Sequence, residues 1–201
     1  MSFMYNPFPF DDPKPINRPK LSEETINSIV TGGTPNVAKK FIAEIAAKVK
    51  SEGVIVGIDG YTTANWKLFV DLLARECIIN GFDFEVVDSN KETLKSGKEI
   101  DDMIDPNLIW DTKIDPTLLY GKLYHGGYIG LFDEAKMEQF KKDVPAKKTA
   151  GKLVVVAGYG SLIPEFRDMY DVKCWFDLTP MKTILRIRNG EYANIGKERP
   201  G

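Results

Sequence analysis

Residues 57–67, GIDGYTTANWK, bring several groups that can bind an anion into one short stretch. Thr62, Thr63 and Asn65 can donate hydrogen bonds, and Lys67 carries a positive charge. If a helix begins here, its first N–H groups and the positive end of its dipole would face the same ligand. The stretch predicts a phosphate-sized site formed by the residues Gly57, Asp59, Gly60, Thr62, Thr63, Asn65 and Lys67. A tight turn whose Trp66 packs into the core is the alternative.

The spacing of these residues departs from the pattern that supports phosphoryl transfer. That pattern is G-x-x-x-x-G-K-[ST], whose lysine and hydroxyl group neutralise charge on the transferring group. Counted from Gly60, its last three positions hold Asn65, Trp66 and Lys67. Lys67 comes one residue late, roughly 100° around a helix. The stretch therefore favours anion binding without catalysis, and no catalytic residue is predicted.

Three further residues are candidates for contacts with a ligand. Asp88 ends an apolar segment and could accept a substrate hydroxyl proton or hold a magnesium-bound water, although an aspartate there is also an ordinary helix N-cap. Arg186 and Arg188, in ILRIRNG, could clamp a nucleotide from a lid. Because they lie two residues apart, they point to different faces of a helix, and arginines near a helix C-terminus need no ligand.

Apolar segments alternate with helical patterns along most of the chain. Short apolar runs predict buried strands at 54–58, 82–88, 152–158 and 171–178, and helical spacing predicts helices at 35–52, 63–79, 115–123, 133–144, 163–170 and 180–188. This alternation predicts a doubly wound parallel α/β sheet with helices on both faces. Ligands bind such sheets beyond the carboxyl ends of the strands, where Asp59 and Asp88 lie.

The chain divides into three predicted parts. Residues 1–20 form a proline-rich arm, because repeated prolines remove backbone donors and restrict the residues before them. Residues 21–52 are N-terminal helices, and residues 53–201 are the α/β domain. Phe8 and Phe10 of the arm are expected to pack on ordered structure.

Composition excludes several classes of protein. The 201 residues carry a net charge of −2 without a long basic run, so no nucleic-acid or anionic membrane partner is expected. No apolar stretch is long enough to span a bilayer, and the start lacks a secretory signal. Cys77 and Cys174 are expected to be buried free thiols in a reducing cytoplasm. One histidine, His125, cannot build a multi-histidine metal site, so no metal is predicted.

With these elements in order, the chain resembles a uridine-kinase-type P-loop domain across roughly residues 53–195. GIDGYTTANWK is similar to that family's phosphate loop, VVDS to its second-strand acidic motif, and PMKTILRIRNG to its arginine-rich lid helix. The segment LVVVAGYGSLIPEFRDMYDVKCWFDL is similar to its strand, short helix and following strand. The resemblance implies a P-loop NTPase-like three-layer sandwich, with Asp88 binding substrate and Arg186 and Arg188 in a nucleotide lid.

The same pattern with its opening, YNPFPFDDPKPINRPKL, also resembles the kinase-like region that precedes the cupin domain in long bacterial class I mannose-6-phosphate isomerases. The isomerase metal site of that family uses histidine, glutamate and glutamine on cupin strands. This chain has one histidine and no cupin-like segment, so it cannot carry that reaction. The resemblance implies an accessory domain with a cupin isomerase domain as its partner, and the polar end GKERPG is typical of a linker.

Three functions remain open from the sequence. The first is a degenerate P-loop domain that binds a nucleotide or sugar phosphate and acts in regulation or assembly. The second is an active kinase of a small hydroxylated substrate, in which Lys67 replaces the lost lysine, Asp88 is the base, and ATP and magnesium are required. The third is a purely structural interaction module. No cofactor is predicted for the first or the third.

Overall fold

The computed structural model of the chain describes residues 22–28, 33–109, 111, 113–114, 122 and 124–192. The predicted proline-rich arm, with Phe8 and Phe10, lies outside the described residues. So do residues 193–201 and most of the predicted helix 115–123. The fold is therefore that of the described residues.

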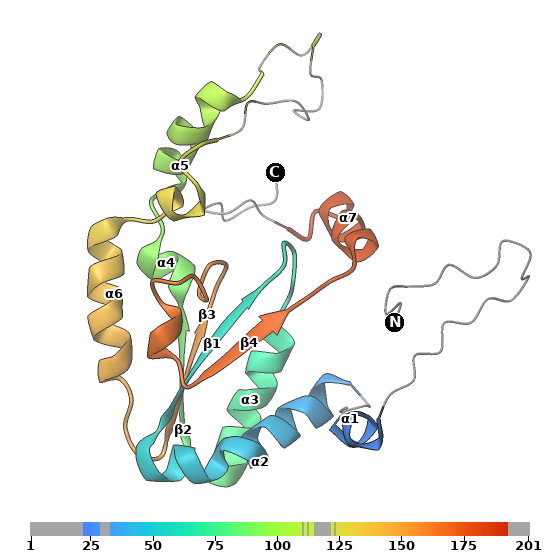
Figure 1. Ribbon diagram of the computed structural model, residues 1–201, viewed down its shortest axis with the longest axis vertical. Helices are drawn as coiled ribbons and strands as arrows, with labels where there is room; N and C mark the ends of the chain where they lie inside the picture. The colour runs from blue at the N-terminus through green and yellow to red at the C-terminus, as the bar shows by residue number, and fades with distance from the viewer. Residues whose placement is uncertain are drawn as a thin grey trace, which may run out of the picture.

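Four parallel strands form one sheet in the order β2-β3-β1-β4 (Figure 1). They are β1 (Val54–Gly60), β2 (Asp83–Asp88), β3 (Lys152–Ala157) and β4 (Val172–Phe176). All seven residues of β1 are buried, because β3 and β4 pair with its two edges and other segments cover its faces. Every end of the four predicted strands agrees with the observed one to within two residues, and the parallel α/β sheet is confirmed.

Helices flank this sheet and precede it. The α-helices are α1 (Glu23–Ser28), α2 (Thr34–Glu52), α3 (Lys67–Asn80), α4 (Ser89–Thr93), α5 (Gly97–Ile104), α6 (Glu134–Ala146) and α7 (Pro180–Arg188). Short 3-10 turns are η1 (Asp105–Asn107), η2 (Tyr128–Leu131) and η3 (Arg167–Met169). In Figure 1, α7 lies beyond the arrowhead of β4, at the carboxyl end of the sheet. No helix in the described part of the chain is long and apolar enough to cross a bilayer.

Alternate residues of the strands build two separate cores. Val54, Val56 and Ile58 of β1 pack with α2 and α3 on what we call the α3 face. Ile55 of β1 packs with α6 and with the segment after β3 on the α6 face. Since successive side chains of a strand point to opposite faces, one strand supplies both cores. The result is a three-layer α/β sandwich.

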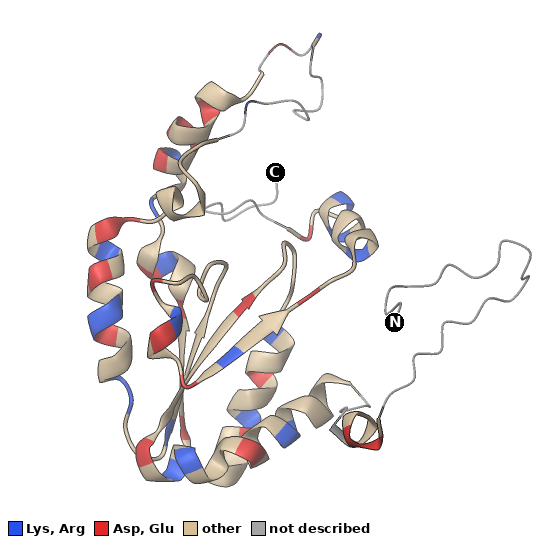
Figure 2. Ribbon diagram, in the orientation of Figure 1, with Lys and Arg blue, Asp and Glu red and all other residues tan. Residues whose placement is uncertain are grey.

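Charged residues lie mainly on the helices and at the ends of the strands, as Figure 2 shows. One of them, Asp171, fixes the amino end of β1. Its carboxylate accepts hydrogen bonds from the Ile55 N–H and from the ammonium groups of Lys48 and Lys148, each at 2.8 Å. Burial alone would raise the pKa of Asp171, but these hydrogen bonds together outweigh burial and hold the pKa below its ordinary value.

Both cysteines are free thiols, as predicted. Cys77 is fully buried on α3, and Cys174 is partly buried on β4. Burial raises the pKa of each thiol to about 11. Neither thiol is therefore an activated nucleophile near neutral pH.

Asp171→Asn is expected to lower the free energy of unfolding at pH 7 by about 1.5–3 kcal/mol, because it weakens hydrogen bonds to a charged acceptor. Since the folded-state pKa of Asp171 is lowered, its contribution is present above the ordinary aspartate pKa of about 3.9 and is lost as pH falls further. Urea unfolding of both proteins should therefore differ at pH 7 and converge toward pH 2–3. Asp168→Asn, at an exposed neighbouring position, is the control. A difference that grows as pH falls would contradict this role.

Candidate functional site

A pocket of about 490 Å³ lies at the carboxyl end of the sheet. β1 and β3 are neighbours, but the chain leaves them toward opposite faces. After β1 it enters α3 on the α3 face, and after β3 it enters residues 158–170, which contribute to the core of the α6 face. In parallel sheets such a divergence opens a crevice beyond the strand ends. Asp59, Gly60 and Thr62 of the predicted site line this pocket.

Asp59 is the buried carboxylate of the pocket, with only 6% of the residue exposed. Its Oδ1 accepts hydrogen bonds from the N–H groups of Gly60 at 2.7 Å and Gly160 at 3.1 Å. Its Oδ2 accepts one from the Leu162 N–H at 3.1 Å. These three donors compensate for the water that the carboxylate loses on burial. The same bonds fix the end of β1 to the turn that follows β3.

The turn after β3 is held from its other side by the start of α4. Asn90 donates from Nδ2 to the Tyr159 carbonyl and accepts from the Tyr159 N–H, at 2.7 and 2.9 Å. The hydroxyls of Ser89 and Ser161 lie 2.6 Å apart. Gly160 has φ +82°, and a Cβ there would lie 2.5 Å from the Tyr128 ring, so this position favours glycine. The turn is a fixed part of the pocket wall.

Aromatic side chains form most of the remaining wall. They are Tyr61, Tyr128, Tyr159, Trp175 and Tyr192. Trp175 pairs with Asp59 in the register of β4 and β1, so the two side chains lie on the same face of the sheet. Burial raises the pKa of Tyr128, Tyr159 and Tyr192, and the charge of Asp59 adds to the effect on Tyr128. These phenols therefore stay neutral near pH 7.

Some N–H groups of the loop between β1 and α3, and the first one of α3, are bonded within the protein. Those of Tyr61 and Ala64 donate to the carbonyls of Phe176 and Tyr61, each at 2.8 Å. The Lys67 N–H donates to the Asn65 side chain at 2.9 Å. The helix predicted at 63–79 thus begins at Lys67, four residues later than expected. The helix N-terminus therefore does not lie at Thr63, where the sequence predicted it.

The carbonyls of the same loop are held by α7 and by Tyr159. Thr183 and Arg186 of α7 donate to the carbonyls of Thr62 and Thr63, and the Tyr159 hydroxyl donates to Ala64. The polar side of α7 therefore faces the loop. Its exposed side carries apolar residues, namely Met181, Ile184, Leu185 and Ile187. Arg186 and Arg188 do point apart, since Arg186 contacts the loop and Arg188 is exposed.

Thr63 is the strained residue of the loop. Its φ is +68°, which a β-branched residue rarely adopts, and the residue is only 5% exposed. Its hydroxyl is one of two buried side-chain groups among the described residues that have no hydrogen-bond partner, the other being the Tyr170 hydroxyl. Backbone strain in native structures gathers at functional sites, and a buried polar group without a partner calls for an explanation. Thr63 lies between the pocket residues and α3.

Trp66 and Lys67 occupy the positions where the phosphate-loop pattern has its lysine and hydroxyl residue. Trp66 is half-buried and packs edge-on against Tyr159 and Phe176, with ring centroids 5.1 and 6.4 Å away. The side chain of Lys67 is 79% exposed and pairs with Asp71 at 3.0 Å. Neither residue lines the pocket.

Gly57 lies within β1, two residues before Asp59. A Cβ at this position would lie 2.5 Å from the ring of Tyr170, which covers the strand on the α6 face. Gly57 thus permits a close approach of side chain to backbone. It does not line the pocket.

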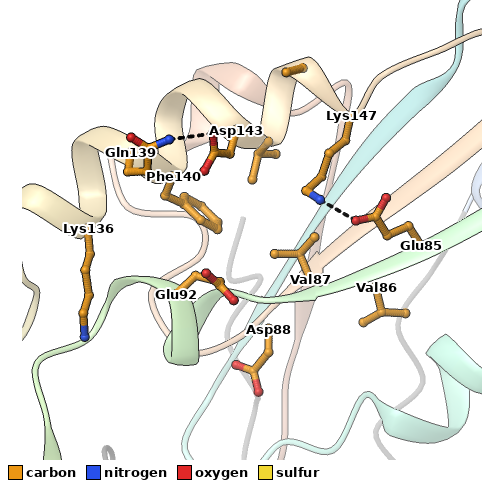
Figure 3. Close-up of a pocket in the computed structure, with 12 residues that line it drawn as sticks. Glu85, Val86, Val87, Asp88, Glu92, Lys136, Gln139, Phe140, Asp143 and Lys147 are labelled. Atoms are coloured by element: carbon orange, nitrogen blue, oxygen red, sulfur yellow. Dashed lines mark hydrogen bonds and ion pairs between the residues drawn. The ribbon is translucent and has the colours of Figure 1, made fainter.

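Asp88 lies at a second pocket, of about 700 Å³, between the edge strand β2 and α6 (Figure 3). Its carboxylate accepts hydrogen bonds from the N–H groups of Asn90 and Lys91, so it is the N-cap of α4, as the alternative interpretation predicted. In this pocket Glu85 pairs with Lys147 at 2.6 Å, and its pKa is lowered by hydrogen bonds from Lys147 and Lys152. The structure does not bring Asp88 together with Asp59.

Sequence reasoning missed the aromatic wall of the first pocket. Tyr159 follows the third apolar segment within GYG, so its place beyond a strand end could have been noticed. Tyr128, Trp175 and Tyr192 carry no comparable local signal. They meet because β3 and β4 lie on either side of β1, an order that the sequence did not indicate.

The fold and the site define a three-layer α/β domain with an aromatic pocket at the carboxyl end of its parallel sheet. The chain belongs to the family described as Domain of unknown function (DUF8485), whose model matches residues 39–201. No curated protein matches the chain. The matched region contains the whole sheet and every pocket residue named above.

Thr63→Gly is expected to raise the free energy of unfolding by up to about 1.5 kcal/mol. Glycine removes about 1–2 kcal/mol of left-handed strain and costs about 0.5–1 kcal/mol of chain entropy. Urea unfolding monitored by circular dichroism measures the change. Thr62→Gly is the matched control, because Thr62 has no positive φ and should only lose stability. Equal destabilisation by both changes would show that Thr63 is not strained.

Proposed function

We propose that this chain is a non-catalytic binding domain that takes a small molecule into the pocket at the carboxyl ends of β1 and β3. The observation that carries the proposal is how the pocket is built. Asp59 is buried and held by three backbone N–H groups, and the turn and loop beside it are fixed by α4 and α7. Sites for small molecules are commonly preformed, aromatic and equipped with few polar groups.

The contacts favour an uncharged or cationic ligand over the phosphate predicted from the sequence. The N–H groups of Gly60, Tyr61, Ala64 and Lys67 are already bonded inside the protein. The described residues that line the pocket include no lysine or arginine. A phosphate would therefore meet the Asp59 carboxylate without a compensating positive side chain.

The contacts also disfavour the kinase hypothesis. Lys67, the replacement for the missing loop lysine, is paired with Asp71 on the exposed side of α3. Asp88, the suggested base, is engaged as a helix cap. Positioning and charge neutralisation supply nearly all of the catalysis in phosphoryl transfer, and these residues supply neither at the pocket.

In this proposal, the domain binds its ligand in order to regulate or assemble a larger protein. A ligand that binds only the folded domain stabilises it and can report its own concentration to an attached partner. The resemblance to long mannose-6-phosphate isomerases suggests a cupin isomerase domain as that partner.

A thermal-shift panel tests the proposal. It contains uridine, methyl mannoside, mannose 6-phosphate, inorganic phosphate, choline and ATP with magnesium. At one hundred times its Kd, a ligand adds about 2.7 kcal/mol, which raises Tm by about 5–10 °C for a domain of this size. We expect at least one such shift, together with no ATP turnover above the buffer rate.

Two variants locate any shift that is seen. Thr62→Trp adds bulk at an exposed residue of the pocket rim and should abolish it. Lys39→Trp adds the same bulk on α2, away from the pocket, and should preserve it. A panel without any shift, or ATP turnover that depends on Lys67, would contradict the proposal.

A further inference from the structure

We propose that this pocket selects a small organic cation, with an alkylammonium group held between the aromatic wall and Asp59. The inference rests on the proposed function, since it assigns the ligand class of the same site. Its basis is the combination of one buried carboxylate with several aromatic rings around a single cavity.

The formal charge of the pocket is negative. Of the described residues that line it, Asp59 alone carries a charged side chain. Its carboxylate is held by N–H dipoles, and within the described part of the chain it forms no ion pair. Oδ2 accepts a single hydrogen bond from these residues, so part of this oxygen can face the charge of a bound cation.

The aromatic walls of the pocket also favour a cation. The faces of tyrosine and tryptophan rings are negative and attract ammonium groups, most strongly where water is excluded. Tyr61, Trp175 and Tyr128, which line the pocket, are partly exposed, at 45%, 60% and 39%. Tyr159 and Tyr192 lie edge to face, with ring centroids 6.3 Å apart. Five rings around one carboxylate would surround a methylated ammonium while Asp59 neutralises its charge.

The test compares choline with 3,3-dimethylbutan-1-ol, which has the same shape but a carbon atom in place of the charged nitrogen. Calorimetric titration of the wild-type chain measures both affinities, and inorganic phosphate is a third titrant. We expect choline to bind at least tenfold more tightly than the neutral alcohol, and phosphate to bind more weakly than either.

Two variants separate the charge from the rings. Asp59→Asn should remove the preference for choline while the circular dichroism spectrum stays that of the wild type. Asp83→Asn, on the exposed start of β2, removes a charge away from the pocket and should keep the preference. Trp175→Leu keeps an apolar side chain at an exposed edge-strand position and removes the ring. It should lower choline affinity severalfold, with little change for the alcohol and an unchanged circular dichroism spectrum.

The outcomes distinguish this inference from the proposed function. Equal affinity for choline and the alcohol, or tighter binding of phosphate, would overturn the cation assignment and leave a binding domain. The same holds if uridine or methyl mannoside binds in the pocket and choline does not. If no compound of either experiment binds, both the inference and the proposed function fail.

Discussion

The structure depends on one strand, β1, being aligned while it is buried on all sides. Its apolar residues supply both cores, and pairing with β3 and β4 sets its register. Two aspartates add hydrogen bonds at its ends. Asp171 accepts the Ile55 N–H at the amino end, and Asp59 accepts the N–H groups of Gly160 and Leu162 at the carboxyl end. Bonds to a charged acceptor are directional and stronger than neutral ones.

The hydrogen bonds that hold the carboxyl end of β1 therefore also build the pocket. Asp59 ties two strand ends together and, in doing so, places a negative charge at the base of an aromatic cavity. The loop after β1 is fixed by α7 through its carbonyls, and the N–H groups of Tyr61 and Ala64, which could have bound a phosphate, are bonded within the protein. The buried carboxylate and the bonding of these two donors both disfavour an anion in the pocket.

The sequence predicted the sheet well because β1 and β3 are almost continuous apolar runs, and because β2 and β4 are short apolar segments between helical patterns. It predicted the α3 start badly, since Thr63 adopts a left-handed conformation that no propensity indicates. The sequence predicted α7 as a helix. It did not predict that the polar side of α7 contacts the loop, because that side is set by hydrogen bonds to Thr62 and Thr63. The pocket wall could not be foreseen, because Tyr128, Trp175 and Tyr192 meet only through the strand order.

That strand order also sets when the domain can fold. Both neighbours of β1 come late in the chain, and the bond from Ile55 to Asp171 joins residues 116 positions apart. During synthesis β1 must wait unpaired until β3 and then β4 have been made, while β2 waits for β3 as well. Folding dominated by such distant contacts is slow and leaves apolar strands exposed in the interval. The nascent chain is thus open to aggregation through these strands until their partners have been made.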